Sequence, residues 1–560
     1  MHGNIFSIMS FAKTYSAQTI GLGAQIINVE VDLSKGLHSF TTVGLPDKGV
    51  EESRDRVSAA IKNSGFTSPK SQNQKVVVSL APADIKKEGP VFDVAISLAY
   101  LLASEDIQFD PEGKLFLGEL SLDGNLRKID GVLPIVAQAK ASRLTEIFLP
   151  KDNAKEAALI SGIKIYGVES LSEIIDHLNE RSSKGEKQAP KTKKKIAEHP
   201  QTEITADDEV FVVDFSEIKG QETAKRGLEI AAAGGHNIAM YGPPGTGKTM
   251  LAKAFSAILP ALTFDEILEI TSIHSIAGVL KTDIITKPPV RNPHHTASYV
   301  SIVGGGAIPK PGEVTLAHRG VLFLDEFPEF DRKVIETLRE PLEEREISIS
   351  RAKGSHTFPA NFILIAAMNP CPCGNFGSKT KECICKPQDL LRYQRKISGP
   401  IVDRIDMWVE VSQIDYEKLS DKESPLKETP AIKERVLQAR NIQKERFAHA
   451  KRNIKTNSDM EAKDIAKIKI YPNQRKLELE IGSYTSLSKI LEAVIPVVYS
   501  SKVEDLDNFR IRSILGLLGK DLKPASVKIQ DAIHFVTDFV SSMTDNYATY
   551  ISKQISGHAV

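Results

Sequence analysis

One segment of the sequence, Gly242-Pro243-Pro244-Gly245-Thr246-Gly247-Lys248-Thr249, follows the pattern G-x-x-x-x-G-K-S/T at every position. The residues before it, 237–241, predict a short buried strand, and residues 250–254 predict the opening of a helix. Loops of this composition between a strand and a helix bind polyphosphates. The alternative, an ordinary turn rich in glycine and proline, does not explain why the lysine and the threonine both stand in place.

Each residue type in this loop has a chemical role in binding ATP and Mg²⁺. The glycines let backbone N–H groups approach the phosphates, and the N-terminus of the following helix adds a favourable dipole. Lys248 is expected to reach the β- and γ-phosphates, and the Thr249 hydroxyl is expected to bind Mg²⁺. The sequence therefore predicts a site for ATP and Mg²⁺.

The length and composition of the chain limit the class of protein it can be. Its 560 residues predict about three to four domains at roughly 150 residues each. Because 72 lysines and arginines balance 72 aspartates and glutamates, nucleic-acid contacts must come from local basic patches. We find no run of about 18 apolar residues and no signal-peptide pattern, so we expect a cytoplasmic protein with no membrane partner.

A second apolar segment, Val321-Leu322-Phe323-Leu324-Asp325-Glu326, ends in two carboxylates. A central parallel strand delivers such residues to its carboxyl edge. Asp325 is expected to hold Mg²⁺, and Glu326 is expected to polarise the water that attacks the γ-phosphate. Two acids after a strand can also cap a helix, but a phosphate loop about 75 residues upstream favours the catalytic interpretation.

The N-terminal part, residues 1–180, has the pattern of one α/β domain. Strands are predicted over 24–32 and 75–80, and helices are predicted over 51–64 and 93–102.

Four short segments of this domain carry a family resemblance. They are Thr42-Val43-Gly44-Leu45-Pro46-Asp47, Arg54-Asp55-Arg56-Val57, Leu80-Ala81-Pro82-Ala83-Asp84 and Lys87-Glu88-Gly89-Pro90. These segments resemble the N-terminal domain of the ComM/YifB family of magnesium-chelatase-like ATPases, which implies the fold of the Lon protease's proteolytic domain. Lon-type proteolysis needs a serine nucleophile after a Gly-Pro pair, together with a lysine, but here Val91 follows Gly89-Pro90. A valine cannot be acylated, so we expect a non-proteolytic domain.

The resemblance extends over residues 214–411 and implies an AAA+ ATPase domain there. Asn369 follows an apolar segment, 362–368, and resembles sensor 1 of AAA+ ATPases, which helps to position the lytic water. Arg404, in Gly399-Pro400-Ile401-Val402-Asp403-Arg404-Ile405-Asp406, resembles the arginine finger of the magnesium chelatase and MCM branch, which completes the neighbouring subunit's site. An arginine between two aspartates can instead form a local salt bridge.

Two insertions are typical of that branch. One is the stretch 272–316, which is punctuated by glycine and proline, and the other is a hairpin predicted over 346–354. Lys310, Arg351 and Lys353 are expected to face a central pore and to contact DNA phosphates.

Cysteines and histidines raise the question of a bound metal. All four cysteines fall in one short segment, at Cys371, Cys373, Cys383 and Cys385. Such clustering predicts either a structural tetrathiolate zinc site or a reduced loop, and the C-x-C spacing is tighter than that of the usual zinc knuckle. A second candidate, His294 with His295, is disfavoured because adjacent residues of a strand point to opposite faces.

The segments that flank the ATPase domain are expected to be a linker and a lid. Residues 181–213 are rich in charge and poor in apolar residues, which predicts a flexible, solvated tether. A charged amphipathic helix predicted over 430–446 opens a helical lid, residues 412–560.

From about Leu477 the sequence departs from the family pattern, which carries a helix with the sensor 2 arginine. Residues 483–490 hold no arginine, and Arg510 and Arg512 come later, out of register. Either the lid has diverged or a reading-frame change altered the tail, so sensor 2 is unassigned.

The sequence thus predicts an α/β protein with an AAA+ phosphate-loop ATPase core, a Lon-protease-like N-terminal domain and a C-terminal helical lid. The resemblance implies a homo-oligomeric ring, expected to be a hexamer, that couples ATP hydrolysis to movement on branched or single-stranded DNA. Helicase-type branch migration during natural transformation is the implied activity. The alternative is a protein-remodelling or chelatase-type motor that acts on a polypeptide, while Val91 disfavours a protease.

Overall fold

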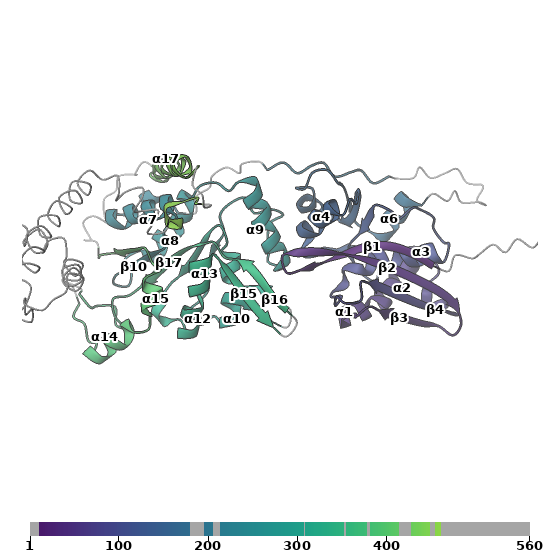
Figure 1. Ribbon diagram of the computed structural model, residues 1–560, viewed down its shortest axis with the longest axis horizontal. Helices are drawn as coiled ribbons and strands as arrows, with labels where there is room; N and C mark the ends of the chain where they lie inside the picture. Colours follow the sequence, from purple (N-terminus) through teal and green to yellow (C-terminus); the bar gives the residue numbers. More distant parts are fainter. Residues whose placement is uncertain are drawn as a thin grey trace, which may run out of the picture. The chain divides into compact units, whose positions relative to one another are not determined.

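The computed structural model describes residues 11–179, 195–204, 213–306, 309–351, 354–377, 381–413, 427–448 and 454–460. We describe residues 11–204 as the N-terminal region and residues 213–448 as the phosphate-loop region, each by itself. Figure 1 shows the first in purple and blue and the second in teal and green.

The first sheet of the N-terminal region has four strands in the order β1-β2-β4-β3. They are β1 (Phe11–Ile20), β2 (Gly23–Lys35), β3 (Ser39–Val43) and β4 (Gln74–Ala81). Only the β3–β4 pair is parallel. Alternate residues of β2 and β4 are buried, for example Val29, Val31 and Val78, so the sheet covers a core on one face. Helices α2 (Ser53–Asn63) and α3 (Asp93–Ala103) contribute to the same core.

A second, parallel sheet of the N-terminal region has the order β5-β8-β9. Its strands are β5 (Lys114–Phe116), β8 (Glu146–Pro150) and β9 (Lys164–Val168). The helices of this part are α1 (Lys48–Glu51), α4 (Val132–Ala141), α5 (Lys151–Ala157) and α6 (Leu171–Leu178), and a small hairpin joins β6 (Glu119–Leu120) to β7 (Leu126–Arg127). Phe148 stacks between Phe116 and Tyr166, with ring centroids 5.3 and 4.8 Å away.

The strands predicted over 24–32 and 75–80 are present, as are the helices predicted over 51–64 and 93–102. The segment 195–204, which lies within the predicted linker, hydrogen-bonds to the N-terminal region. The Ile196 and His199 amides donate to His177 Nδ1 and the Ile165 carbonyl, at 2.9 and 2.8 Å. This part of the expected tether therefore extends the N-terminal region, and the remainder, up to residue 212, lies outside the described residues.

A five-stranded parallel sheet forms the centre of the phosphate-loop region, in the order β11-β14-β17-β10-β18. The strands are β11 (Val290–Arg291), β14 (Val321–Leu324), β17 (Ile363–Met368), β10 (Ile238–Tyr241) and β18 (Met407–Glu410). Successive residues of β14 alternate between two cores, with Leu322 in one and Phe323 in the other. Because both faces are buried, the strands are continuous apolar runs.

Different helices cover the two faces of this sheet. The core that contains Phe323 includes residues of α7 (Glu222–Gly234), α8 (Lys248–Phe255) and the later helix α17 (Thr429–Phe447). The core that contains Leu322 includes residues of α10 (Tyr299–Val303), α11 (Glu313–Leu316), α12 (Arg332–Thr337) and α13 (Arg339–Glu344). The other helices of the region are α9 (Phe264–Ile276), α14 (Pro387–Gln394) and α15 (Gly399–Val402).

The hairpin predicted before the sensor strand is present and is longer than expected. It pairs β15 (Glu346–Arg351) with β16 (Gly354–Pro359) in antiparallel register. A smaller antiparallel pair joins β12 (Gly304–Gly305) to β13 (Lys310–Pro311) within the predicted insertion. The Lys310 side chain is exposed, whereas the Arg351 side chain and Lys353 lie outside the described residues.

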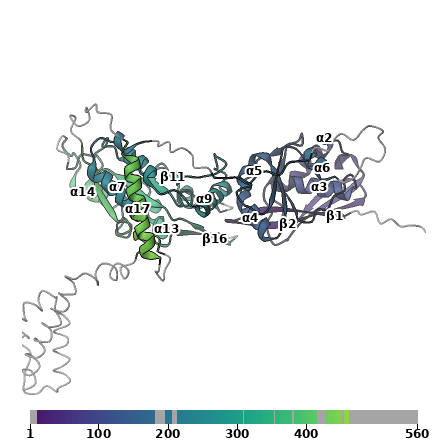
Figure 2. The same ribbon diagram turned by 90° about the horizontal axis from the view of Figure 1, so that it is seen from above.

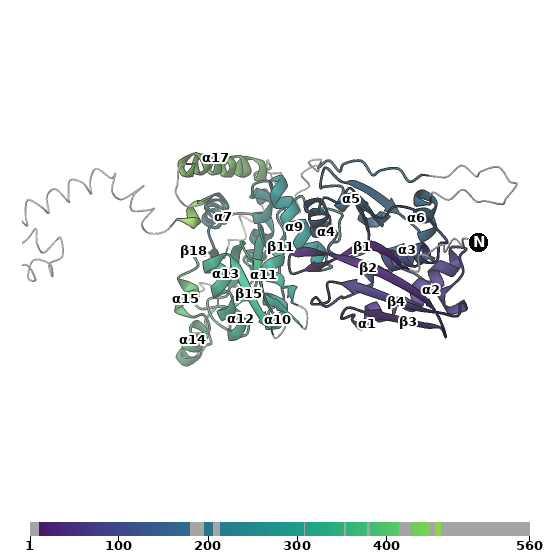
Figure 3. The same ribbon diagram turned by 45° about the vertical axis from the view of Figure 1, so that its right-hand side comes forward.

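The helix predicted over 430–446 is α17, which lies along α7 (Figures 2 and 3). Arg435 Nε donates to Glu229 Oε1 at 2.7 Å, and Gln443 Nε2 donates to the Ala233 carbonyl at 2.8 Å. The divergent tail after about residue 477, with Arg510 and Arg512, lies outside the described residues. Among the residues that are described, no helix is long and apolar enough to cross a membrane.

Candidate active site

The phosphate loop joins β10 to α8 at the carboxyl edge of the parallel sheet. Gly245 and Gly247 have φ values of +77° and +91°, and a Cβ at either position would meet no atom within 4 Å. Glycine adopts these values without strain, so the loop backbone stays accessible on that side. Helix α8 begins at Lys248, two residues earlier than expected, which places the loop directly at a helix N-terminus.

Lys248 is almost buried, with 8% of its surface exposed. Its ammonium donates to the Gly242 and Pro243 carbonyls at 2.7 and 2.8 Å, and to Asn369 Oδ1 at 3.3 Å. Burial lowers the pKa of Lys248, and the charge of Asp325 partly opposes that effect. The cation is thus held at the loop by neutral carbonyl oxygens, which an anionic phosphate can replace.

Thr249 contacts Asp325, the first of the two acids after β14. Thr249 Oγ1 donates to Asp325 Oδ2 at 2.8 Å, so a hydroxyl and a carboxylate oxygen adjoin. Oxygen ligands of this kind fit Mg²⁺, which binds one or two protein oxygens together with phosphate oxygens. Glu326 has a φ of +53°, an uncommon value for a residue with a side chain. That backbone turn directs Glu326 differently from the strand residues before it.

His295 contacts Glu326, the proposed catalytic acid, and no sequence pattern predicts this contact. His295 Nδ1 lies 3.2 Å from Glu326 Oε2, although the two residues are 31 positions apart in the chain. Our reason for disfavouring a histidine pair was wrong, because residues 292–298 are not a strand and the His294 and His295 rings lie 4.2 Å apart. Among the described residues, the four cysteines are the only group of three or more side chains placed to bind a metal ion. The His294–His295 pair is not part of such a group.

Asn369 lies at the end of β17, the strand between the phosphate-loop strand and the strand that leads to Asp325. Its side chain accepts from Lys248, and its carbonyl accepts from the Tyr393 hydroxyl at 3.1 Å. Burial raises the pKa of Tyr393, so that hydroxyl keeps its proton and remains a donor. The predicted sensor residue Asn369 therefore adjoins the phosphate loop, and the Tyr393 hydroxyl on α14 holds its backbone in place.

Arg404 follows α15 and is 37% exposed at its side chain. Its guanidinium donates to Glu343 on α13, so its ion-pair partner is not one of the flanking aspartates. Within the described chain it makes no hydrogen bond to its own phosphate loop.

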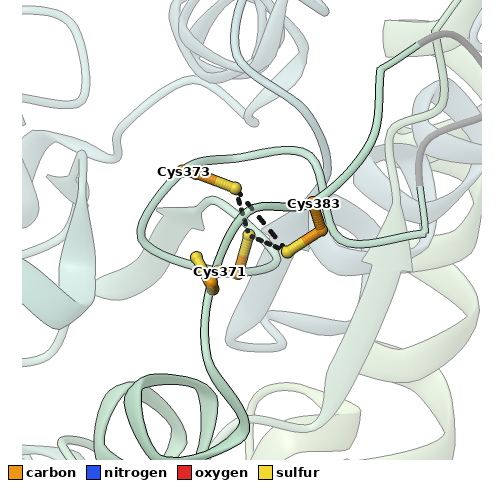
Figure 4. A group of neighbouring side chains, drawn as sticks. Cys371, Cys373 and Cys383 are labelled. Atoms are coloured by element: carbon orange, nitrogen blue, oxygen red, sulfur yellow. Dashed lines mark hydrogen bonds between the residues drawn. The ribbon is translucent and has the colours of Figure 1, made fainter.

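The four cysteines converge as a tetrathiolate site requires, and Figure 4 labels three of them, Cys371, Cys373 and Cys383. Their sulfurs all lie within 4.8 Å of one another, and the separations among Cys371, Cys373 and Cys383 are 3.4, 3.8 and 3.6 Å. A tetrahedral site with Zn–S bonds of roughly 2.3 Å would separate its sulfurs by about 3.8 Å. The Phe376 amide donates to Cys371 Sγ at 3.3 Å. The donor set and its spacing therefore fit Zn²⁺, although the sulfurs lie slightly closer than a metal would hold them.

A basic groove lies beside α14, and the sequence did not predict that its residues come together. It is lined by Phe330, Arg332, Gln388, Leu391, Arg392, Arg395 and Lys396. Lys396 pairs with Glu329 at 2.9 Å, whereas the three arginines form no ion pair within the part of the chain that the structure describes. Such a groove suits a phosphate-bearing ligand.

Comparison with known proteins agrees with the geometry of this site. Residues 214–419 match the family model described as magnesium chelatase, subunit ChlI, and residues 29–153 match the model described as subunit ChlI of Mg-chelatase. The chain is 40% identical over 469 residues to the competence protein ComM of Haemophilus influenzae, which covers 82% of this chain and 86% of that relative. The chain belongs to the ComM/YifB family.

Two further matches differ in extent. The uncharacterized protein YifB of Escherichia coli is 40% identical over 438 residues, which cover 78% of this chain and 82% of that relative. A short match, 35% identical over 98 residues, is to a deoxyguanosinetriphosphate triphosphohydrolase-like protein of Pseudomonas aeruginosa and covers 18% of this chain. Membership in the magnesium-chelatase-like AAA+ ComM/YifB family confirms the family prediction and implies an ATPase that uses ATP and Mg²⁺.

Proposed function

We propose that this ComM/YifB protein is a ring-shaped motor that couples ATP hydrolysis to movement on DNA. One observation carries the catalytic part: at the phosphate loop Lys248 hydrogen-bonds to Asn369 and Thr249 hydrogen-bonds to Asp325, whose charge acts on Lys248. In this proposal Lys248 binds the β- and γ-phosphates, while Thr249 and Asp325 hold Mg²⁺. Mg²⁺ neutralises charge that develops on the phosphates.

Glu326 is the proposed general base, and Asn369 is proposed to orient the attacking water with it. Glu326 is 53% exposed at its side chain, so water reaches its carboxylate. His295 occupies one carboxylate oxygen of Glu326 in the structure. That contact must loosen, or remain on the oxygen that does not take the proton, when water is activated.

The ring part of the proposal depends on Arg404 acting as a finger in the neighbouring subunit's site. Its exposure and its pairing with Glu343 support this role, because neither ties the guanidinium to the subunit's own phosphate loop. A finger supplied in trans stabilises charge on the transferring phosphoryl group, so hydrolysis requires assembly. We propose a hexamer.

DNA is the proposed track, with branch migration in recombination of incoming DNA as the activity. The similarity to a protein named for competence supports this choice, as do exposed Lys310 and the basic groove that contains Arg332, Arg392 and Arg395. Phosphate contacts of this kind are independent of base sequence, as a translocating motor requires. Arg351 and Lys353 remain predicted DNA contacts.

A motor that acts on a polypeptide is the second candidate, because both matching family models are described by a magnesium chelatase subunit. The N-terminal region is proposed to be a Lon-like domain without a nucleophile. Val91, after Gly89-Pro90, packs on apolar cores of that region and offers no nucleophilic atom.

ATPase assays with defined polymers separate these candidates. We expect turnover to rise several-fold with forked or single-stranded DNA and to stay at its basal level with an unfolded polypeptide. Added salt should weaken the DNA effect, because the contacts are to phosphates. Stimulation by the polypeptide alone would contradict the DNA proposal and favour the second candidate.

We also propose that Cys371, Cys373, Cys383 and Cys385 bind one structural Zn²⁺ per chain. Four thiolates leave no open coordination position, so the metal would stabilise the loop and would not activate water. Replacing Cys371 and Cys383 together by serine should release about one zinc per chain and destabilise the segment. Elemental analysis of protein purified without a chelator checks this, and finding no metal would contradict it.

A further inference from the structure

The cysteine loop, residues 371–385, lies between two elements that reach the nucleotide site. It begins two residues after Asn369, at the end of β17, and it ends two residues before Pro387, where α14 begins. Figure 4 shows Cys371, Cys373 and Cys383 facing one another across this loop. A metal bound there would therefore fix the spacing between the end of β17 and the start of α14.

Gly374 brings the cysteine loop into contact with the phosphate loop. Its amide donates to the Cys371 carbonyl at 2.9 Å, which forms a tight turn with a φ of +79°. A Cβ at Gly374 would lie 2.6 Å from Pro244 Cδ and 3.1 Å from Pro244 Cγ. The backbone of the cysteine loop is thus packed directly on Pro244, within the phosphate loop.

Asn369 provides the second connection. Its side chain accepts from Lys248, and its backbone carbonyl accepts from Tyr393 on α14. Tyr393 is 8% exposed, so the hydroxyl is held in a packed position. The helix that follows the cysteine loop therefore contacts Asn369, the residue that accepts from the phosphate-binding lysine.

We infer that metal binding by the four cysteines is coupled to nucleotide binding, so that the metal-bound loop holds Pro244 and Asn369 in the arrangement that binds ATP. The inference rests on the proposed function, since it takes the phosphate loop as the ATP site and the cysteines as a zinc site. Without the metal, the loop loses its cross-link and gains conformational freedom. Nucleotide binding must then order the loop around Pro244 and Asn369. The entropy cost of this ordering lowers the affinity for ATP.

Coupling of this kind is reciprocal. If zinc raises the affinity for ATP by some factor, ATP must raise the affinity for zinc by the same factor. Couplings between sites are typically about 5- to 150-fold. A bystander zinc site would show no such linkage.

The first experiment measures the affinity of the full-length protein for a fluorescent ATP analogue with zinc bound, after chelation and after zinc is returned. We expect the affinity to fall at least about fivefold on chelation and to recover when zinc is added back. Zinc affinity, measured by competition with a chromogenic chelator, should fall by the same factor when nucleotide is absent. Circular dichroism reports whether the chain stays folded.

A pair of glycine variants tests the contact while all four cysteines remain. Gly374→Ala forces a Cβ against Pro244 and should weaken the binding of the ATP analogue with one zinc retained. Gly377→Ala is the matched control, because its φ of +76° costs similar backbone strain but its Cβ would meet no atom within 4 Å. We expect Gly377→Ala to bind the analogue as the unmodified chain does.

Each outcome decides one part of the argument. Equal affinity for the analogue with and without zinc, or equal affinities of the two glycine variants, would overturn the coupling. If the purified protein holds no zinc, the metal assignment and the coupling both fail while the ATP site stands. If the zinc-bound protein does not bind the analogue at all, the proposed function itself is wrong.

Discussion

Two buried lysines lie beside glycine-containing loops in this molecule, and their surroundings differ. Lys248, in the phosphate-loop region, donates to two backbone carbonyls and to the side chain of Asn369. Lys87, in the N-terminal region, is fully buried and donates to the carbonyls of Pro82 and Ile85. Burial lowers the pKa of both lysines.

The difference lies in which other side chains converge. Around Lys248 the chain gathers Asn369, Thr249 and Asp325, whose polar atoms come from three separate elements. After Lys87 the chain passes through Gly89-Pro90 to Val91. The carboxylate of Asp93, two residues later, accepts from Arg56, with Nε 2.7 Å from Oδ2. A buried lysine at a turn therefore indicates a chemical site only where polar side chains also converge.

Replacing Lys248 should produce the largest effect. Lys248→Ala is expected to abolish ATP binding, because the ammonium is the main side-chain charge that opposes the β- and γ-phosphates. Lys253→Ala, on the exposed side of the same helix, is the control and should bind ATP normally. Calorimetric titration with ATP and Mg²⁺ measures both, and unchanged affinity in Lys248→Ala would contradict the assignment.

Glu326→Gln should separate binding from chemistry. The variant is expected to keep ATP affinity and to lose at least about a hundredfold in turnover, the lower range for removing a general base. Glu329→Gln, three residues later and exposed, should retain near-normal turnover. Steady-state phosphate release gives the rates, and a loss of less than tenfold, an order of magnitude under the expected figure, would remove Glu326 from the role of base.

Lys87→Met tests the other half of the comparison. It leaves two carbonyls without a donor and should lower the free energy of unfolding by about 2 kcal/mol, within the range for losing buried hydrogen bonds. ATP affinity should not change. Lys86→Met is the matched control, because Lys86 is exposed and pairs with Glu88 at 3.0 Å on the surface. A loss of ATP binding in Lys87→Met, with the fold intact, would mean that Lys87 is functional.

Asp214 extends the comparison to a buried carboxylate of the phosphate-loop region. Burial raises its pKa, but hydrogen bonds from Ser216, Thr429 and Glu428 outweigh that effect and lower the pKa to about 2. A folded-state pKa below the unfolded value means that the stabilisation is complete above about pH 4 and is lost as the pH falls toward 2.

Asp214→Asn should therefore cost up to about 2 kcal/mol at neutral pH and less near pH 3. Urea unfolding of both proteins at pH 7 and pH 3 measures the difference. A cost that does not shrink as the pH falls would show that the carboxylate's charge is not responsible.

The convergence of the phosphate loop with Asp325 and Asn369 was predictable because each follows an apolar segment that reads as a parallel strand. Strands in one parallel sheet end at the same edge, so the positions of these residues in the sequence were enough to predict that they lie close together. The family match confirms the implied ATPase class. The catalytic roles of Glu326 and Arg404 stay predictions.

The contacts that the sequence did not predict join residues far apart in the chain through irregular backbone. Gly374 against Pro244 and His295 against Glu326 are examples, and neither has a periodic pattern. His294 and His295 do not point to opposite faces of a strand, because the chain turns there. Residues 195–204 likewise have a linker composition, yet their amides find carbonyl and imidazole acceptors on the N-terminal region.

We propose that each ATP site is completed by Arg404 of a neighbouring subunit. Arg404→Ala and Lys248→Ala should each be nearly inactive alone, the first because it lacks the finger and the second because it lacks the phosphate-binding lysine.

The decisive measurement is the ATPase rate of these two variants mixed and reassembled. A mixed ring contains interfaces that pair an intact phosphate loop with an intact finger, so part of the activity should return. If mixed rings form, as shown by a pull-down through a tag on one variant, and the rate stays at the level of either variant alone, Arg404 is not the finger. Arg392 and Arg395, in the basic groove, would then be tested in the same way.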